Sequence, residues 1–272
     1  MNDSADSPTP EATSKDQSQP PASQSASGQS RAVSKKQPPD VHDATHAPTD
    51  GVSLKTGDVV GGQFRVERLL GSSGGGVSYL CKNTSTDDDV VIKVLSIGAP
   101  TDEHFEAIQD QVRQASSIGH PNLTKILGMG TTASDEVFVA MEYVRGSTLS
   151  RVVAQRRDSG ETLTMRDAFT VMAHVCDALE AVHAQMAHGV LTPYNIYLSH
   201  RGEVKVGNLA FGRIAAKYLL ESEGAGPFVD SIYVAPEATN APDRISPASD
   251  LFSLGMIAAE LLSEKGLPDE RR

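Results

Sequence analysis

The stretch that decides the fold is residues 187–212, AHGVLTPYNIYLSHRGEVKVGNLAFG. It contains two short apolar runs, residues 196–198 and residues 204–206, joined by a polar turn. Apolar runs of this length on either side of a glycine-containing turn predict a β-hairpin. One asparagine stands just before the first strand, Asn195, and another just after the second, Asn208. The stretch therefore predicts a hairpin flanked by two amide side chains.

The same stretch resembles the catalytic and metal-binding loops of protein kinases. The family pattern H-R-D-L-K-P-x-N, then a hairpin, then D-F-G, is matched in order by HGVLTPYN at residues 188–195 and NLA at residues 208–210. The resemblance covers roughly residues 58–262 and is close to bacterial eukaryotic-like Ser/Thr kinases, whose domains open with a stretch similar to GGQFRVERLLG at residues 61–71. It implies an α+β, bilobal protein-kinase-like fold with a small β-rich N-lobe, one αC helix and a mainly helical C-lobe.

Composition limits the classes of function. The chain has 272 residues and a formal net charge of −11, so it lacks an electrostatic footprint for nucleic acid or anionic membrane. It has no apolar run long enough to span a membrane and no signal-peptide region. A cytoplasmic protein without nucleic-acid or membrane partners is therefore expected. The two cysteines, Cys81 and Cys176, show no disulfide or zinc spacing and are expected to be buried.

The sequence divides into a tail and a domain. Residues 1–52 are rich in Ser, Pro, Gln and Thr and contain no aromatic residue, so they are expected to be disordered, either as a solvated tail or as a partner-binding tether. Residues 58–272 are expected to form the kinase-like domain, with the N-lobe at about 58–143 and the C-lobe at about 144–272. Because the sequence ends where the family has further helices, the C-lobe is expected to be incomplete after the αF helix around residues 249–256, either as a truncated lobe or because the sequence is a fragment of a longer chain.

A glycine-rich turn and a lysine in an apolar strand precede the hairpin. The turn is GSSGGG at residues 71–76, and the strand is VIKV at residues 91–94. On their own these features indicate a hairpin turn and an edge strand. In this order they resemble the kinase phosphate loop, with a serine at its second glycine, and the strand lysine that neutralises ATP phosphates. The residues that the resemblance implies at an ATP site are Gly71, Gly74, Gly76, Lys93, Glu142 and Asn195.

Residues 102–118 predict an amphipathic helix. Thr101 can cap it, and its apolar residues share one face. These residues are Phe105, Ile108, Val112 and Ala115. The helix resembles the family's αC helix, and the position whose glutamate would pair with Lys93 holds Gln111. Lys93 is therefore expected to lack its ion pair.

Further elements follow the order of the family. Strands are predicted at residues 126–127 and 137–143, a hinge at residues 142–146, and a long helix at residues 163–184. The apolar residues of this helix are expected in the core. They are Phe169, Met172, Val175, Leu179 and Val182.

The positions that carry kinase chemistry are degenerate. The base position holds Val190, which cannot accept a proton, and the metal position holds Asn208, a neutral amide in place of a carboxylate. Gly189, Thr192 and Asp230 replace the family's arginine, lysine and threonine. No catalytic residue and no metal ligand are therefore expected, and magnesium binding is not expected without ATP.

The sequence leaves ATP binding open. The hinge contributes backbone hydrogen bonds to adenine, and these need no particular side chain. Val91 and Tyr197, however, stand where the family has alanine and leucine on the two sides of the purine. The slot is therefore expected to be narrower than in an active kinase.

These replacements predict a pseudokinase that acts as a regulatory or scaffolding module in phosphorylation signalling. Its expected partner is a protein, either an active kinase or a kinase substrate. One alternative is a weak or atypical ATP-dependent Ser/Thr protein kinase, or a nucleotidyl transferase that uses the ATP site differently. A second alternative is a decayed kinase relative without function, which poor expression and a noncooperative melt would favour.

Overall fold

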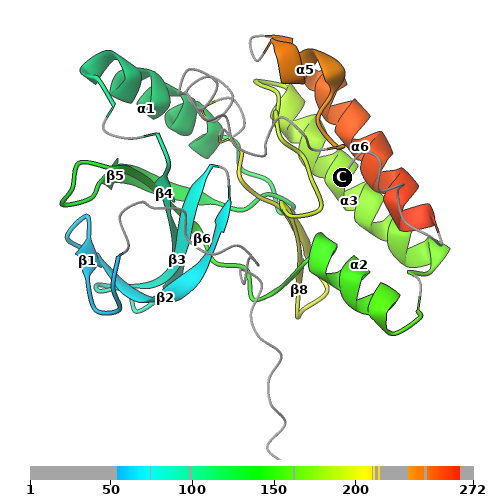
Figure 1. Ribbon diagram of the computed structural model, residues 1–272, viewed down its shortest axis with the longest axis horizontal. Coiled ribbons are helices and arrows are strands. Elements are labelled where there is room, and N and C mark those ends of the chain that lie inside the picture. Colours follow the sequence, from blue (N-terminus) through cyan, green and yellow to red (C-terminus); the bar gives the residue numbers. More distant parts are fainter. Residues whose placement is uncertain are drawn as a thin grey trace, which may run out of the picture. The chain divides into compact units, whose positions relative to one another are not determined.

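The computed structural model describes residues 54–73, 75–97, 100–161, 163–209, 211, 214, 232–241 and 244–263 (Figure 1). The expected tail at residues 1–52 lies outside these ranges, as do Gly74, Ala210 and Asp230. Within the described ranges, strands come first in the chain and most helices follow. The structure therefore has the α+β class that the sequence predicts.

A six-stranded antiparallel sheet forms the first part of the fold, with the strand order β1-β2-β3-β4-β6-β5 (Figure 1). Its strands are β1 (Val59–Val60), β2 (Phe64–Ser73), β3 (Gly76–Asn83), β4 (Asp89–Leu95), β5 (Ile126–Thr131) and β6 (Val137–Glu142). The glycine-rich turn is shorter than predicted, because Gly71 lies within β2 and Gly76 begins β3. Residues predicted to cradle phosphate are thus partly strand residues.

Strand β4 lies inside the sheet and is buried on both faces. Val90 and Ile92 join an apolar cluster on one face, whereas Val91 and Leu95 join the larger cluster on the other. Because side chains alternate along a strand, Lys93 projects to the same face as Val91 and Leu95. It is only 4% exposed, so the water-facing edge position that the strand suggests on its own is not found.

Helix α1 (Asp102–Ser116) begins where the sequence predicts and packs beside β5. The hydroxyl of Thr101 accepts a backbone N–H in the first turn, and Ile108 and Val112 are buried. The cap and the buried face together fix the rotation of the helix about its axis. Gln111 consequently lies beside the buried face rather than on the solvent side.

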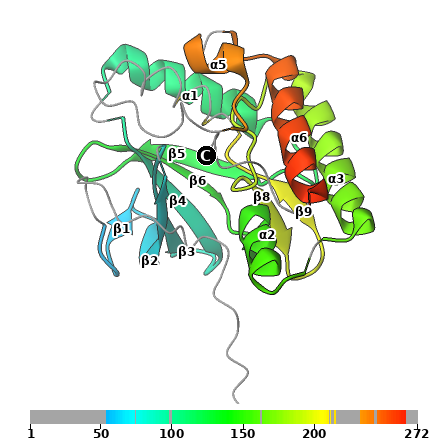
Figure 2. The ribbon, with the colours of Figure 1, turned by 45° about the vertical axis from the view of Figure 1, so that its right-hand side comes forward.

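The second part of the fold is helical and carries a three-stranded sheet. The helices are α2 (Leu149–Asp158), α3 (Met165–His183), α5 (Pro236–Asn240) and α6 (Pro247–Leu262), and the strands are β7 (Gly146–Thr148), β8 (Ile196–Ser199) and β9 (Val204–Val206). The hairpin predicted from the central stretch is β8–β9, and it is confirmed. Helices α3 and α6 lie side by side in both ribbon views (Figure 1, Figure 2).

Helix α3 corrects two expectations. Phe169 is 59% exposed, because Ala168 and Val171 take the inward positions and neighbouring helix residues differ in direction by about 100°. Val175, Leu179 and Val182 are buried as predicted. Cys176, expected to be buried, is exposed on the same helix.

One large cluster of buried side chains joins the two parts of the fold. It runs from β4, β6 and α1 through β8 and β9 to α3 and α6. The central hairpin is therefore packed between the six-stranded sheet and the helices. None of the described helices is both long and apolar enough to cross a membrane.

Candidate functional site

The loop before the hairpin is fixed by one buried carboxylate. Asp250 on α6 is 1% exposed and accepts the backbone N–H groups of His188 at 2.7 Å and Gly189 at 2.8 Å. The Nε2 atom of His183 lies 2.9 Å from the same carboxylate. Asp250 therefore tethers the loop to α6.

His188 fixes the loop from the other side. Its ring is fully buried, its Nε2 donates to the carbonyl of Gly207 at 2.9 Å, and its Nδ1 accepts the N–H of Val190 at 3.4 Å. Burial is the main cause that lowers the pKa of His188 below its usual value. The histidine is therefore a neutral packing residue that joins the loop to the end of the hairpin.

The two asparagines at the ends of the hairpin bond to each other. The Nδ2 group of Asn208 donates to Oδ1 of Asn195 at 2.6 Å, and Nδ2 of Asn195 donates to the carbonyl of Val190. Asn208 adopts a left-handed backbone conformation with φ of 62°, which asparagine tolerates better than most residues. The side-chain oxygen that Asn195 would offer to a metal is already used in this bond.

The donor set at this position does not fit magnesium. Mg²⁺ prefers carboxylate and phosphate oxygens in octahedral geometry. The metal position offers two neutral amides joined by one hydrogen bond, and among the described residues no group of three His, Cys, Asp or Glu side chains converges. The absence of a protein-held metal site stays a prediction.

The base position is apolar in the structure as well. Val190 is 8% exposed and contributes its backbone groups to the loop. Its side chain can neither accept the proton of an attacking hydroxyl nor orient that hydroxyl. The geometry therefore places a valine where catalysis would require a carboxylate.

Lys93 has an unusual environment for a buried cation. Its Nζ lies 4.6 Å from the centroid of the Phe211 ring, and it forms no ion pair or hydrogen bond with the described residues. Burial lowers the pKa of Lys93 to about 8. An aromatic face attracts a cation, so Phe211 partly replaces the missing carboxylate.

Gln111 occupies the position of the missing glutamate without taking over its role. Its Oε1 atom is buried and has no hydrogen-bond partner among the described residues. A buried, unpaired amide oxygen destabilises the fold relative to a satisfied one. The predicted loss of the lysine–glutamate ion pair is consistent with this arrangement.

Two of the predicted phosphate-loop glycines, Gly71 and Gly76, lie in the β2–β3 ladder. Gly76 has φ of +141°, and a Cβ added there would lie 2.0 Å from the carbonyl oxygen of Val94. Gly71 lies at a register shift of the β2–β3 ladder. Close strand contact therefore explains Gly76 without any ligand.

Tyr197, at the predicted purine end of the nucleotide site, is a buried aromatic side chain. Tyr197 is 5% exposed and packs against Val144 of the hinge. A Cβ added to Gly207 would lie 2.5 Å from the Tyr197 ring, so the ring also passes close to the backbone at the end of β9. Tyr197 therefore packs between the hinge and the end of β9, and the narrower purine slot stays a prediction.

Glu142 at the hinge is used within the protein. Its carboxylate pairs with Nζ of Lys205 at 3.0 Å and accepts the backbone N–H of Lys125 at 3.1 Å. The ion pair connects the last residue of β6 to β9. The side chain of Glu142 therefore links the two sheets, whereas any adenine contact would come from its backbone.

Sequence reasoning missed two contacts of the site and its surroundings. Phe211 was not recognised as the partner of Lys93, although an aromatic residue soon after Asn208 is a usable signal. Glu237 accepts a hydrogen bond at 2.8 Å from the Ser249 hydroxyl at the start of α6. A serine near the N-terminus of a helix was the available signal for that contact.

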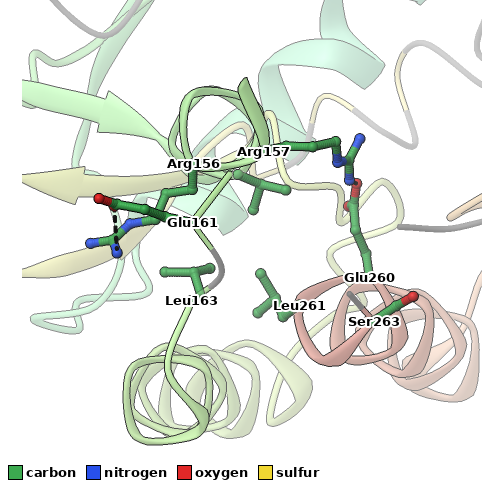
Figure 3. A pocket seen from close by; sticks show the side chains of 8 residues that line it. Arg156, Arg157, Glu161, Leu163, Glu260, Leu261 and Ser263 are labelled. Atoms are coloured by element: carbon green, nitrogen blue, oxygen red, sulfur yellow. Dashed lines mark hydrogen bonds and ion pairs between the residues drawn. The ribbon is translucent and has the colours of Figure 1, made fainter. Parts of the chain in front are cut away.

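A hollow of about 40 Å³ lies apart from these residues, between the C-terminal ends of α2 and α6 (Figure 3). Leu163 and Leu261 lie between two ion pairs there, Arg156–Glu161 at 3.5 Å and Arg157–Glu260 at 3.7 Å. It shares no lining residue with the predicted nucleotide site and is far smaller than a nucleotide pocket. The hollow is therefore a small gap where α2 and α6 pack together. Its arginine and glutamate side chains already form ion pairs with each other.

Comparison with known proteins agrees with the loop and lobe geometry. Residues 64–271 match the family described as "Protein kinase domain". The serine/threonine-protein kinase PrkC of Bacillus subtilis is 28% identical over 210 residues, which cover 76% of this chain and 31% of PrkC. The serine/threonine-protein kinase Pkn1 of Myxococcus xanthus is 32% identical over 209 residues, covering 74% of this chain and 29% of Pkn1. The chain thus spans about a third of the length of these curated relatives.

Solved structures support the fold. The crystal structure of the Mycobacterium tuberculosis PknI kinase domain matches with a TM-score of 0.63 and 22% sequence identity, covering 81% of this chain and 80% of that one. At this identity the similarity shows the fold alone. With the family match over residues 64–271, it leads to one conclusion: the chain belongs to the protein kinase domain family and has bacterial Ser/Thr kinases as relatives.

Proposed function

We propose that this protein is a pseudokinase, a cytoplasmic binding module that regulates or scaffolds phosphorylation signalling. The observation that carries the proposal is the closed pair of Asn208 and Asn195 at the metal position. Phosphoryl transfer needs cations on the phosphate oxygens and an acceptor for the hydroxyl proton. The amide pair and Val190 supply neither of them.

The loop keeps the hydrogen bonds that maintain its fold, although it lacks the acidic side chains that catalysis requires. Asp250 still tethers the catalytic-type loop, and His188 still joins it to the hairpin. A kinase fold that is preserved without its catalytic acids supports a role in binding. Because the matched relatives are Ser/Thr kinases, we propose that the partner is an active kinase or its protein substrate.

Phosphoryl transfer tests the loss of catalysis. The full chain is incubated with radiolabelled ATP, casein and either Mg²⁺ or Mn²⁺, beside a Lys93→Met variant and an active bacterial Ser/Thr kinase domain. We expect the wild-type chain and Lys93→Met to give the same background signal. Transfer by the wild type that the variant loses would contradict the proposal.

Binding tests the positive part of the proposal. Calorimetry with purified Ser/Thr kinases and kinase substrates of the same cell should find a partner whose affinity is the same for wild type and Lys93→Met. An interaction lost in that variant would contradict a module that binds independently of ATP. A lack of binding to any of these proteins would contradict the proposed partner class.

A weak ATP-dependent kinase is the second candidate, because Lys93 remains buried in β4 and Asn195 remains at its loop position. The Val190→Asp/Asn208→Asp double variant separates the two candidates. A weak kinase would gain strongly in phosphoryl transfer when both acids are restored. A pseudokinase whose Lys93 is covered by Phe211 and whose purine end is filled by Tyr197 should gain little.

A further inference from the structure

Helix α6 presents an apolar face to solvent along its whole length. Its exposed residues are Pro247, Ala248, Leu251, Gly255, Ala259 and Leu262. Its two charged residues are both buried and are used inside the protein, Asp250 as the tether of the loop and Glu260 as the partner of Arg157. A helix that is apolar all round is normally covered by other protein. The outer face of α6 therefore has the composition of a packed surface.

Four residues of α6, which we call the α6 seam, form a single row on this face. They are Leu251, Gly255, Ala258 and Leu262. Their spacing of four, three and four residues keeps them within about 60° around the helix axis, and it is the spacing at which one helix packs along another. Leu251 and Leu262 are 57% and 46% exposed and stand about 16 Å apart along the axis. The seam thus has a large apolar residue at each end and two small residues between them.

Gly255 is not required by the packing of α6 within this chain. A Cβ added there would meet nothing within 4 Å, and its backbone does not adopt the left-handed conformation. Glycine in the middle of a helix destabilises that helix relative to alanine. The distance between two packed helices depends on the side chains at their contact. A second helix that approaches α6 closely at this point would explain the glycine.

We propose that α6 is the contact surface for a second copy of this chain, with the two α6 helices antiparallel about a twofold axis between Gly255 and Ala258. The order of sizes along the seam is the same in both directions: large, small, small, large. In an antiparallel pair, Leu251 of one copy therefore meets Leu262 of the other at each end. The small residues meet in the middle, where the helices are closest. A surface that matches itself in this way forms a closed twofold interface.

The distribution of charge favours a second copy as the occupant of this face. The chain has a formal net charge of −11, so two copies repel each other in most orientations. No exposed residue within 247–262 is charged, so a symmetric contact through α6 brings no like charges together. A partner that recognised the acidic character of this chain would find no carboxylate on the seam.

The proposed interface is small, so the dimer should be weak and reversible. Helix α6 has 16 residues and is about 24 Å long. One pair of helices of this length buries less than the roughly 800 Å² per partner of a standard protein interface. We therefore expect a dissociation constant of about 10–100 μM.

The test is sedimentation velocity of the full chain over a concentration series of about 5–200 μM, across which the wild type should shift from monomer to dimer. Leu251→Glu and Leu262→Lys each place a charge in the seam. Each should weaken the dimer by about tenfold or more, because the charge is desolvated in the contact. Leu127→Glu is the matched control, since Leu127 on β5 is 53% exposed and lies outside the proposed interface. The control should associate like the wild type.

A mixture of the Leu251→Glu and Leu262→Lys chains provides a second arm. In the antiparallel register the introduced carboxylate of one chain faces the introduced ammonium group of the other, and the two unchanged leucines meet at the opposite end. The mixture should therefore recover the dimer that neither variant forms alone. Thermal melts of each variant establish that it is folded.

Three results would overturn the inference. A wild-type chain that stays monomeric at the highest concentration would leave other residues of the same chain, or a different protein, as the cover of α6. Association that neither seam variant weakens would place the interface elsewhere on the molecule. A mixture that stays monomeric would exclude the antiparallel register. None of these measurements involves a nucleotide or phosphoryl transfer, so they are independent of the proposed function.

Discussion

Lys93 shows how the loss of neighbouring acids changes the energetics of a single residue. In β4 it projects to the larger apolar cluster, and the Phe211 ring is its one described polar or aromatic partner. An unpaired buried cation destabilises a fold, because desolvation is only partly offset by the attraction of an aromatic face.

Replacement of Lys93 by methionine should therefore stabilise the free protein. The native pKa of about 8 lies below the usual 10.5, so between these values the unfolded state binds more protons and the free energy of unfolding of the wild type rises with pH. We expect Lys93→Met to be more stable than the wild type by about 2–3 kcal/mol at pH 7, and less so at pH 10. Urea unfolding in phosphate-free buffer at pH 7 to 10 measures this. A difference that stays constant across the range would contradict it.

Much of the site at the residue scale could be predicted from motif order. Val190, Asn208 and Gln111 occupy the places that the resemblance assigns, and Lys93 lies in its strand. The contact of Lys93 with Phe211 was not predicted, although the position of Phe211 soon after Asn208 was a usable signal for it.

At the scale of elements, a glycine of the glycine-rich turn can serve either the packing of two strands or the binding of a ligand. Gly76 is required by the approach of β3 to β4, since a Cβ would meet the Val94 carbonyl at 2.0 Å. The same glycine was predicted to serve phosphate binding. Stability measurements distinguish the two roles without any ligand.

A Gly76→Ala variant should lower the free energy of unfolding by about 2 kcal/mol, from the positive φ and the backbone clash. Gly119→Ala is the matched control, because an added Cβ there meets nothing within 4 Å. We expect the control to stay within about 0.5 kcal/mol of the wild type. Equal stabilities of the two variants in chemical denaturation would show that the β3–β4 approach does not require glycine.

The elements differ in how far the sequence predicts them. Helix α1 was found because Thr101 caps a clear apolar face. Helix α2 was missed, since only Leu149 within it is fully buried and its pattern is weak. Ala168 and Phe169 in α3 are neighbouring residues and both are apolar. The sequence alone therefore could not show which of the two side chains faces the core.

At the scale of the whole molecule, one core cluster and one ion pair connect the six-stranded sheet to the central hairpin. The ion pair joins Glu142 at the end of β6 to Lys205 in β9, and their side chains are 28% and 13% exposed. Partial burial reduces screening by solvent, so this pair should contribute more than a surface pair.

A double-mutant cycle with Glu142→Gln and Lys205→Met should give a coupling free energy of about 1 kcal/mol. The control cycle uses Asp110→Asn and Arg113→Met, an exposed pair within α1. It should give about 0.3 kcal/mol. Urea unfolding supplies all the values, and equal coupling in the two cycles would show that the hinge pair is an ordinary surface interaction.

The central claim is that this kinase fold does not hold a metal–nucleotide complex. Its most direct test is the thermal melt of the purified full chain with ATP, recorded in EDTA and in Mg²⁺, beside Lys93→Met. Ligand that binds the native state raises the melting temperature by mass action. We predict a cooperative melt in which Mg²⁺ adds nothing to any shift that ATP produces in EDTA. A rise that requires Mg²⁺ and disappears in Lys93→Met would contradict the claim and restore the kinase as an enzyme.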